Sequence, residues 1–254
     1  MNSQQYQQEI WNMRVAVKVE LQKSNIPPMY LMIYRQHYLL FYYQQIYDHF
    51  DSFSPQVNKI NQISFLYKDV LLPYQIPFGL LVDLYKSDDT FIPIELQLIY
   101  QKEAHFLDLE DEIRNQIKFN LKQACFGRYN HEGYGTPLKN LTQYMSISDE
   151  KQALKQIKSF ENKEDLYKYY KKIFESPKTG RIQLPIRIYF KKGGHLQTII
   201  ELKDQQLTIG QALRTKLQGG TFIFNGLNLN MNIPAQDFYD QLYSIDGFCY
   251  FVCE

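Results

Sequence analysis

The same order of short elements can be read twice in this chain, once toward each end, and this repetition limits how the chain can fold. Each copy reads strand, strand, helix, strand, strand, short helix and strand, from the spacing of its apolar residues. In the first copy we expect strands at 13–21, 29–34, 63–67, 70–72 and 94–100, and helices at 37–50 and 78–85. In the second copy we expect strands at 182–190, 196–202, 221–224 and 248–252, a turn at Asn225-Gly226, and helices at 209–217 and 236–243.

This element order is that of a ubiquitin-like (β-grasp) fold, in which a sheet is covered by a helix. The predicted class is therefore α+β, with ubiquitin-like domains at 13–102 and 179–254 and a short helix at 1–12. The turn and capping residues of the second copy agree with this fold, because Gly193-Gly194 suits a hairpin turn and Thr208 can cap the next helix. Neither copy is placed like a conjugation donor, which needs a free C-terminal glycine, since the chain ends in Cys253-Glu254. This favours a scaffold or an acceptor.

The residues between the two copies, 103–178, are expected to form a helix-rich domain. Acidic residues crowd the start of a first helix that runs to about Phe126, where negative charge is favourable at the positive end of the helix dipole. They are Asp108, Glu110, Asp111 and Glu112. Two further helices are expected at 149–158 and 163–174.

The first helix of this middle region has two stripes at four-residue spacing. Ile113, Ile117, Leu121 and Cys125 make an apolar stripe. Arg114, Lys118 and Lys122 lie one position further round and should form a more exposed, basic stripe. Spacing alone indicates only an ordinary solvated helix face.

Composition argues for a folded protein in a reducing compartment. The chain has 254 residues, 44% hydrophobic and 15% aromatic, enough for two or three small domains. A net charge of +1 gives no general attraction to nucleic acid, and three cysteines do not make a disulfide framework. The sequence has no apolar run of ~20 residues and no apolar signal-peptide segment at its start. We therefore expect a cytoplasmic protein without nucleic-acid partners.

The residues that could form a catalytic or metal centre do not come in the required patterns. Cys125 falls near a helix C-terminus, where the dipole disfavours a thiolate. Cys249 and Cys253 share one face of a strand and are expected in the core. The five histidines show no pair with metal-ligand spacing, and the glycine pairs lack a phosphate-loop lysine. We expect no metal, no cofactor and no enzymatic activity.

Several segments, taken in order, resemble the autophagy-related protein 5 family over nearly the whole chain. They are 10–14 (IWNMR), 28–33 (PMYLMI), 77–84 (PFGLLVDL), 184–189 (LPIRIY) and 225–227 (NGL). In the middle, Leu121-Lys122-Gln123-Ala124 is similar to the stretch that holds the acceptor lysine of the family. The fold that the resemblance implies, two ubiquitin-like domains flanking a helix-rich domain, agrees with the element order. One departure is the turn at Lys68-Asp69, which lacks an expected glycine.

The resemblance implies a non-catalytic scaffold of the autophagy machinery. Such a protein accepts autophagy-related protein 12, itself ubiquitin-like, through an isopeptide bond to one lysine, and holds the N-terminal helix of autophagy-related protein 16. The complex acts like an E3: with an E2-like enzyme, it promotes transfer of autophagy-related protein 8 to phosphatidylethanolamine on forming autophagosomes. The implied location is the cytoplasm and, peripherally, the phagophore membrane. Two alternatives stay open, a non-covalent contact in place of the bond and a ubiquitin-like adaptor without conjugation.

The resemblance assigns the acceptor role to Lys122. Acceptor chemistry needs an amine on a long side chain, fixed at its base and free at its tip, that can reach a thioester carbonyl. Attack needs the neutral amine, whereas a free lysine has a pKa near ~10.4. We therefore expect the E2-like enzyme to supply most of the positioning and deprotonation.

Three residues and one run are candidates for partner contacts. The resemblance suggests Trp11, Arg14 and Arg187 beside the groove for a partner helix, with core anchoring as the alternative for Trp11. The run Tyr167-Lys168-Tyr169-Tyr170-Lys171-Lys172 is basic and aromatic. It is either a site of peripheral membrane contact or a solvated helix face with buried tyrosines.

Overall fold

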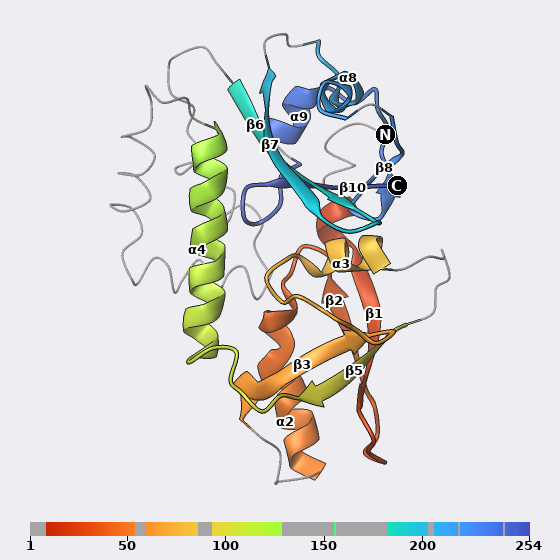
Figure 1. Cartoon of the computed structure of the whole chain (residues 1–254), viewed down its shortest axis with the longest axis vertical. Helices are drawn as coiled ribbons and strands as arrows, with labels where there is room; N and C mark the ends of the chain where they lie inside the picture. The colour runs from red at the N-terminus through yellow and green to blue at the C-terminus, as the bar shows by residue number, and fades with distance from the viewer. Residues whose placement is uncertain are drawn as a thin grey trace. The chain divides into compact units, whose positions relative to one another are not determined.

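The computed structural model describes residues 9–53, 59–85, 93–128, 155, 182–202, 206–217, 219–240 and 242–254, with backbone only at 125–128 and 182. The chain divides into two compact units, residues 8–115 and residues 116–254 (Figure 1). Apart from residue 155, the helices expected at 149–158 and 163–174, and with them the run 167–172, lie outside the described residues.

The first unit contains a five-stranded sheet in the order β2-β1-β5-β3-β4. Its strands are β1 (Arg14–Leu21), β2 (Met29–Tyr34), β3 (Ile63–Tyr67), β4 (Val70–Leu71) and β5 (Ile94–Tyr100). The central strands β1 and β5 run parallel, with Val19 opposite Leu96, and the other neighbours are antiparallel. Val17, Val19, Leu96 and Leu98 are buried, so one face of this sheet meets the core.

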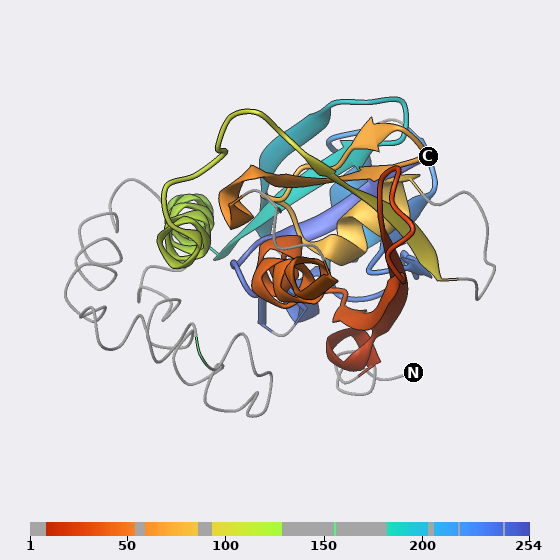
Figure 2. The same cartoon turned by 90° about the horizontal axis from the view of Figure 1, so that it is seen from below.

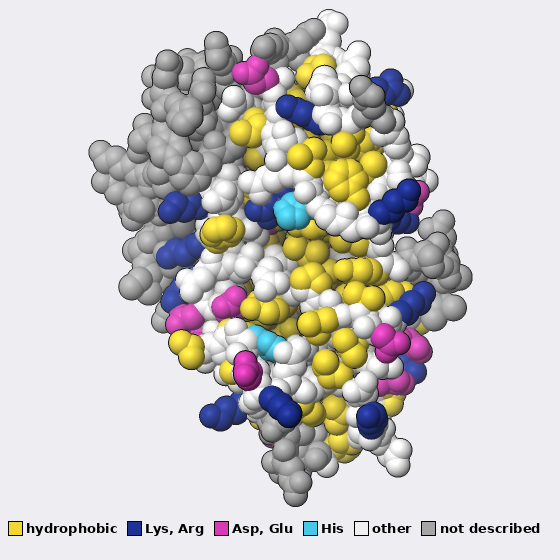
Figure 3. Space-filling view, in the orientation of Figure 1, with side chains coloured by type: hydrophobic (Ala, Val, Ile, Leu, Met, Phe, Trp, Pro, Cys, Tyr) yellow, Lys and Arg dark blue, Asp and Glu magenta, His cyan; other side chains and the backbone are white. Residues whose placement is uncertain are grey.

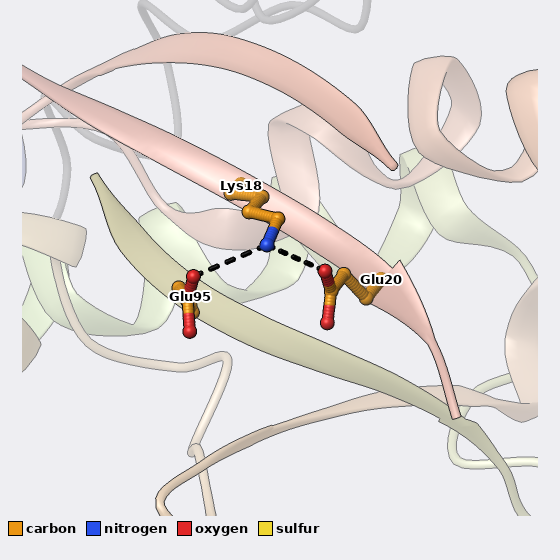
Figure 4. A network of polar contacts seen from close by, with 3 residues as sticks. All are labelled: Lys18, Glu20 and Glu95. Carbon is orange, nitrogen blue, oxygen red and sulfur yellow. Dashed lines mark hydrogen bonds and ion pairs between the residues drawn. The ribbon is translucent and has the colours of Figure 1, made fainter. Parts of the chain in front are cut away.

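On the other face of the sheet, a group of charged side chains connects the parallel strands β1 and β5 (Figure 4). Lys18 of β1 places its Nζ 2.6 Å from Oε1 of Glu20 and 3.1 Å from Oε1 of Glu95 on β5. The hydrogen bond to Glu20, followed by that to Glu95, raises the pKa of Lys18. Since the group is exposed to solvent, this ion triad adds little to stability.

The helix expected at 37–50 begins later than the apolar spacing predicts. The His37 N–H donates to the carbonyl of Tyr34 at 3.0 Å, and Tyr38 is held extended by a bridge to Pro77. The 3-10 turn η1 (Leu39–Tyr42) then leads into α2 (Tyr43–Phe53). Figures 1 and 2 show α2 against the first sheet, where the ring of Tyr43 packs 5.1 Å from that of Phe65. The unit is completed by η2 (Ile60–Gln62) and α3 (Phe78–Tyr85).

The second unit repeats the topology with the order β7-β6-β10-β8-β9. Its strands are β6 (Ile182–Phe190), β7 (His195–Leu202), β8 (Phe222–Phe224), β9 (Leu227–Asn228) and β10 (Cys249–Cys253). Again the central pair is parallel, with Ile188 opposite Phe251, and the outer pairs are antiparallel. The prediction of two ubiquitin-like folds is therefore confirmed.

Two short helices complete the second fold, α8 (Ile209–Arg214) and α9 (Ala235–Asp240). Thr208 caps α8 as predicted: its side chain accepts from the N–H of Gln211, whose side chain accepts from the Thr208 N–H. The helix is shorter than the expected 209–217, because the chain leaves it through a turn at Thr215.

Strand β6 differs from the expected alternation. Leu184, Ile186 and Ile188 are buried as predicted, but Pro185 and Arg187 between them are buried as well. Both faces of β6 are therefore covered, as in a strand at the centre of a layered fold. Arg187 is buried because its face of β6 is covered too, and the alternating sequence pattern did not predict this.

Large apolar side chains also reach the surface in both units (Figure 3). The most exposed are Tyr30, Met32, Phe53, Val70, Leu71, Leu107, Phe119 and Ile199. Single exposed apolar residues are common on folded proteins. No described helix has both the length and the apolar character needed to cross a bilayer.

Candidate functional site

Helix α4 (Leu109–Arg128) carries the candidate acceptor lysine, and its start is fixed by a side-chain cap. Oδ1 of Asp108 accepts from the N–H of Asp111 at 2.9 Å, so Asp108 satisfies a backbone donor that the helix leaves unpaired. Glu110, Asp111 and Glu112 occupy the first turn, where their charges suit the helix dipole. The acidic cluster thus marks the beginning of α4, as the sequence indicates.

One face of α4 is buried along the length for which side chains are described. Ile113, Ile117 and Leu121 are 1%, 5% and 1% exposed, which is the apolar stripe predicted from four-residue spacing. Ala124 continues this face, and Asn120, at 1% exposed, lies within it. A polar residue inside an apolar stripe needs a hydrogen-bond partner, so Asn120 marks a specific contact.

Asn120 bonds to two residues of the second ubiquitin-like domain. Its Nδ2 donates to Oδ2 of Asp246 at 3.0 Å, and its Oδ1 accepts from a terminal nitrogen (NH1) of Arg187 at 3.1 Å. Asp246 is fully buried and Arg187 is 8% exposed. Buried charges are tolerated only when they are paired or hydrogen-bonded. The amide of Asn120 makes one hydrogen bond to each of these two charged side chains.

The remaining contacts of Arg187 hold its guanidinium in one place. Its Nε donates to Oε1 of Gln197 at 2.9 Å, and its NH1 donates to the Tyr250 hydroxyl at 3.2 Å. The guanidinium carbon lies 3.8 Å from the ring centroid of Phe248. The hydroxyl of Tyr250 in turn donates to the carboxylate of Asp246.

The pKa values of Tyr250 and Arg187 are both raised, but for different physical reasons. Burial, then the charge of Asp246, raises the pKa of Tyr250 well above its usual value, against the lowering influence of Arg187. For Arg187, burial is the largest influence and lowers the pKa, but Tyr250 and Asp246 outweigh it, so the pKa is raised. Arg187 is therefore charged and Tyr250 protonated throughout the physiological range.

Lys122 lies on the outer side of the same helix. Its side chain is exposed, whereas Leu121 before it and Ala124 after it are buried. In the predicted basic stripe, Lys118 is half-buried and Arg114 forms an ion pair with Asp111. Lys122 is thus fixed at its base by a buried helix face while its amine is accessible.

Two predicted partner residues are buried, which corrects the expectation that they present a binding surface. Trp11, on the helical segment 9–12, is 2% exposed, so its ring is part of the core, which was the alternative expected for it. Arg187 is part of the buried network described above. The spacing of apolar residues cannot distinguish an arginine that faces a partner from one that faces a packed helix.

Arg14 is the one predicted partner residue that is exposed. It stands opposite Tyr34 in the β1–β2 register, with its guanidinium carbon 4.2 Å from the centroid of that ring. It also hydrogen-bonds to the Tyr34 hydroxyl. The aromatic contact keeps the guanidinium over the ring of Tyr34 at the exposed surface of the first sheet.

Potential metal ligands are dispersed in the part of the chain that the structure describes. Among them, no three His, Cys, Asp or Glu side chains are grouped so as to hold a metal ion. Cys249 is buried, as expected, and Cys253 at the end of β10 is half-buried. Among the described side chains of this part of α4, Lys122 presents an exposed primary amine.

Comparison with protein families matches both ends of the chain to domains of one family. Residues 10–100 match the family described as "Autophagy protein ATG5, UblA domain", and residues 183–253 match "Autophagy protein ATG5, UblB domain". The two matches coincide with the two β-grasp sheets.

Individual relatives agree with this assignment. Autophagy protein 5 of Candida glabrata is 24% identical over 212 residues, covering 75% of this chain and 73% of the relative. Autophagy-related protein 5 of Kluyveromyces marxianus is 24% identical over an alignment of 278 residues, covering 98% of this chain and 99% of the relative. The crystal structure of Kluyveromyces marxianus Atg5 shares the fold with a TM-score of 0.81, at 22% identity, over 99% of this chain and 100% of that one. The chain therefore belongs to the ATG5 family of autophagy proteins.

Proposed function

We propose that this protein, whose family gives it a role in autophagy, accepts the ubiquitin-like autophagy-related protein 12 on the amine of Lys122. The observation that carries the proposal is the placement of Lys122. It is exposed on a helix whose opposite face is buried, within the segment that resembles the family's acceptor stretch. A long side chain held at its base is suited to enter the active site of a second protein.

The reaction we propose is an aminolysis. The neutral Nζ of Lys122 attacks the carbonyl carbon of a thioester that joins the C-terminal glycine of the incoming protein to a cysteine of an E2-like enzyme. A C–N bond forms, the C–S bond breaks, the amine loses a proton, and the enzyme's thiolate leaves and takes up a proton. The acceptor chain contributes the nucleophile and its position, and the E2-like enzyme activates the carbonyl group.

In this proposal the product is a non-catalytic scaffold subunit. The chain would bind the N-terminal helix of autophagy-related protein 16, with exposed Arg14 at the contact, and the complex would stimulate the E2-like enzyme that transfers autophagy-related protein 8 to phosphatidylethanolamine. The protein would act in the cytoplasm and peripherally at the phagophore membrane. Support comes from family membership and from the presence of both β-grasp domains in this chain.

The membrane contact is proposed for the basic, aromatic run 167–172. Replacing its three lysines, Lys168, Lys171 and Lys172, by glutamate reverses the charge that would attract anionic lipid. Flotation with liposomes containing anionic lipid measures the effect. Reduced flotation supports the contact, and unchanged flotation removes the run from the proposal.

The acceptor role is tested by substituting the lysine without changing its charge. Lys122→Arg keeps the positive charge and the helix but lacks the primary amine, so it should abolish the covalent product. Lys118→Arg, four residues earlier on the same helix, is the matched control and should conjugate normally. Each variant is expressed with the conjugation enzymes, and the shifted band is read on an immunoblot.

The outcomes separate the alternatives. Loss of the shifted band in Lys122→Arg alone supports the acceptor role. A conjugate at normal yield in Lys122→Arg rejects that residue. An unshifted wild-type chain that still copurifies with its ubiquitin-like partner replaces the covalent acceptor by a non-covalent adaptor.

A further inference from the structure

The hydrogen bonds of Asn120 define the position of α4 in more detail than its apolar contacts do. Ile117, Leu121 and Ala124 fill space, but apolar side chains allow small rotations and shifts of a helix. The amide of Asn120 uses both of its ends, donating to Asp246 at 3.0 Å and accepting from Arg187 at 3.1 Å. Hydrogen bonds are directional, so two such bonds from one side chain select one rotation and one axial position of the helix.

The partners of Asn120 are themselves held in place. Arg187 lies in β6, and its guanidinium is fixed by Gln197 and by the ring of Phe248. Asp246 lies just before β10, the strand next to β6, and its Oδ1 accepts from the N–H of Phe248 at 3.3 Å. The amide therefore connects α4 to the two central strands of the second sheet through a network with buried members. Such networks make a packed arrangement unique.

Lys122 takes its direction from Asn120. The two residues are separated by two positions, which turns their side chains about 200° apart on a helix of 3.6 residues per turn. When Asn120 points into the domain, Lys122 must point nearly the opposite way. Any rotation or slide of α4 at Asn120 is passed to Lys122, because less than one rigid turn separates them.

We propose that Asn120, Arg187 and Asp246 form a positioning clamp that sets the direction of the Lys122 amine for transfer. This proposal rests on the acceptor role of Lys122 and deepens it: the lysine reacts, and the three clamp residues act only through it. A displacement of about 1 Å in the position of a reacting group can slow a reaction about 100-fold. Loosening the clamp should therefore lower the rate of transfer more than it weakens docking of the charged enzyme.

The test is single-turnover transfer of the ubiquitin-like protein from a charged E2-like enzyme to the full chain. The rate constant at saturating acceptor and the half-saturating acceptor concentration are measured separately. The variant is Asn120→Ala, and the matched control is Asn115→Ala, an exposed asparagine on the same helix. Rates are expressed per folded molecule, from far-UV circular dichroism at the assay temperature. If Asn120→Ala does not fold, Asn120→Ser, which leaves a hydroxyl in place of the amide, is used with the same expectation.

We expect Asn120→Ala to lower the saturating rate constant about 10-fold or more and to change the half-saturating concentration less than about twofold. Amide hydrogen exchange over 116–124 should rise in the same variant, while Asn115→Ala matches the wild type in both measurements. A rate within twofold of the wild type, with exchange increased, overturns the clamp and leaves Lys122 as acceptor. Absence of any conjugate on the wild-type chain overturns the acceptor role and the clamp together.

Discussion

Gly79 lies so close to Arg35 that a Cβ atom at position 79 would stand 2.6 Å from the Cβ of Arg35 and 2.8 Å from its carbonyl oxygen. The Gly79 N–H donates to that carbonyl at 2.7 Å, which joins the start of α3 to the chain before α2. The second domain has the same crossing between Gly210 and Met231, with a Cβ distance of 2.6 Å. In that domain the glycine lies on the first helix, α8, rather than on the second. Both domains therefore contain this close glycine contact, but a different helix of the domain supplies the glycine in each case.

Gly79→Ala should destabilise the first unit. The added methyl group meets backbone atoms of Arg35, which cannot move without breaking the hydrogen bond between the Gly79 N–H and the Arg35 carbonyl. Overpacking of this kind costs about 1–3 kcal/mol. Urea unfolding followed by the fluorescence of Trp11, the single tryptophan and a buried residue of this unit, measures the change. Gln45→Ala on the exposed face of α2 is the control and should leave the midpoint near that of the wild type.

The ion pair between Arg35 and Asp83 should contribute strongly when one partner is removed. Their side chains are 8% and 7% exposed, and a terminal nitrogen (NH2) of Arg35 also donates to the carbonyl of Gly79 at 2.9 Å. Asp83→Ala leaves a buried guanidinium without its counter-charge, which costs about 3–5 kcal/mol. Urea unfolding gives the value. Lys18→Ala, at the exposed triad of Figure 4, is the matched ion-pair control and should shift the midpoint far less. Equal shifts of the urea midpoint in the two variants would contradict the expectation that the buried ion pair contributes more than the exposed one.

The turn between β3 and β4 is strained, and a glycine should relieve it. Lys68 and Asp69 have φ values of 48° and 63°, in the left-handed region that disfavours residues with a side chain. The corresponding turn of the second domain uses Asn225 and Gly226, at 51° and 83°, a combination suited to it. Asp69→Gly should therefore stabilise the first unit by up to about 1 kcal/mol. A lower urea midpoint in Asp69→Gly would show that the aspartate makes a contact worth more than the strain.

Stability should fall at alkaline pH, in part through Tyr42. Burial raises the pKa of Tyr42 to about 12, although the Tyr34 N–H that bonds to its hydroxyl opposes the shift. In the unfolded chain a tyrosine has a pKa near ~10. The folded state thus holds the proton more tightly, so the stabilisation is complete below pH ~10 and is lost as pH rises toward about 12.

Urea unfolding at a series of pH values checks this linkage. Tyr42→Phe should lose less stability between pH ~10 and ~12 than the wild type does, because it has no hydroxyl to ionise at this position. Tyr30→Phe, which changes an exposed ring on β2, should decline like the wild type. A decline in Tyr42→Phe as steep as in the wild type would show that other groups carry the effect.

The fold could be predicted from the sequence wherever a pattern has a period. Alternation at Val17 and Val19 and four-residue spacing at Ile113 and Ile117 each reflect one buried face, and both elements form where expected. Boundaries were less accurate, because they depend on contacts between distant residues. The bridge of Tyr38 to Pro77, for example, delays α2, and no local pattern signals it.

In the candidate site, too, local patterns predicted some features, whereas features that depend on distant residues were missed. Lys122 could be placed on the outer side of α4 from helical spacing and the family resemblance, and the structure leaves it exposed. Asn120 was missed, although its place seven residues after Ile113 puts a polar group within the apolar stripe. Its partners Arg187 and Asp246 lie 67 and 126 residues further along the chain, so the network could not be read locally. The partner roles expected for Trp11 and Arg187 failed for the same reason: burial of a long side chain is decided by what packs on it.

The proposed acceptor role places the ubiquitin-like protein on one particular atom of the chain. The conjugate formed by the wild-type chain with its E2-like enzyme can be digested with trypsin and its branched peptide sequenced by mass spectrometry. We predict one branch, with the C-terminal remnant of the partner on Nζ of Lys122. A branch on any other lysine, or a native complex that contains the partner without a covalent bond, would contradict the account.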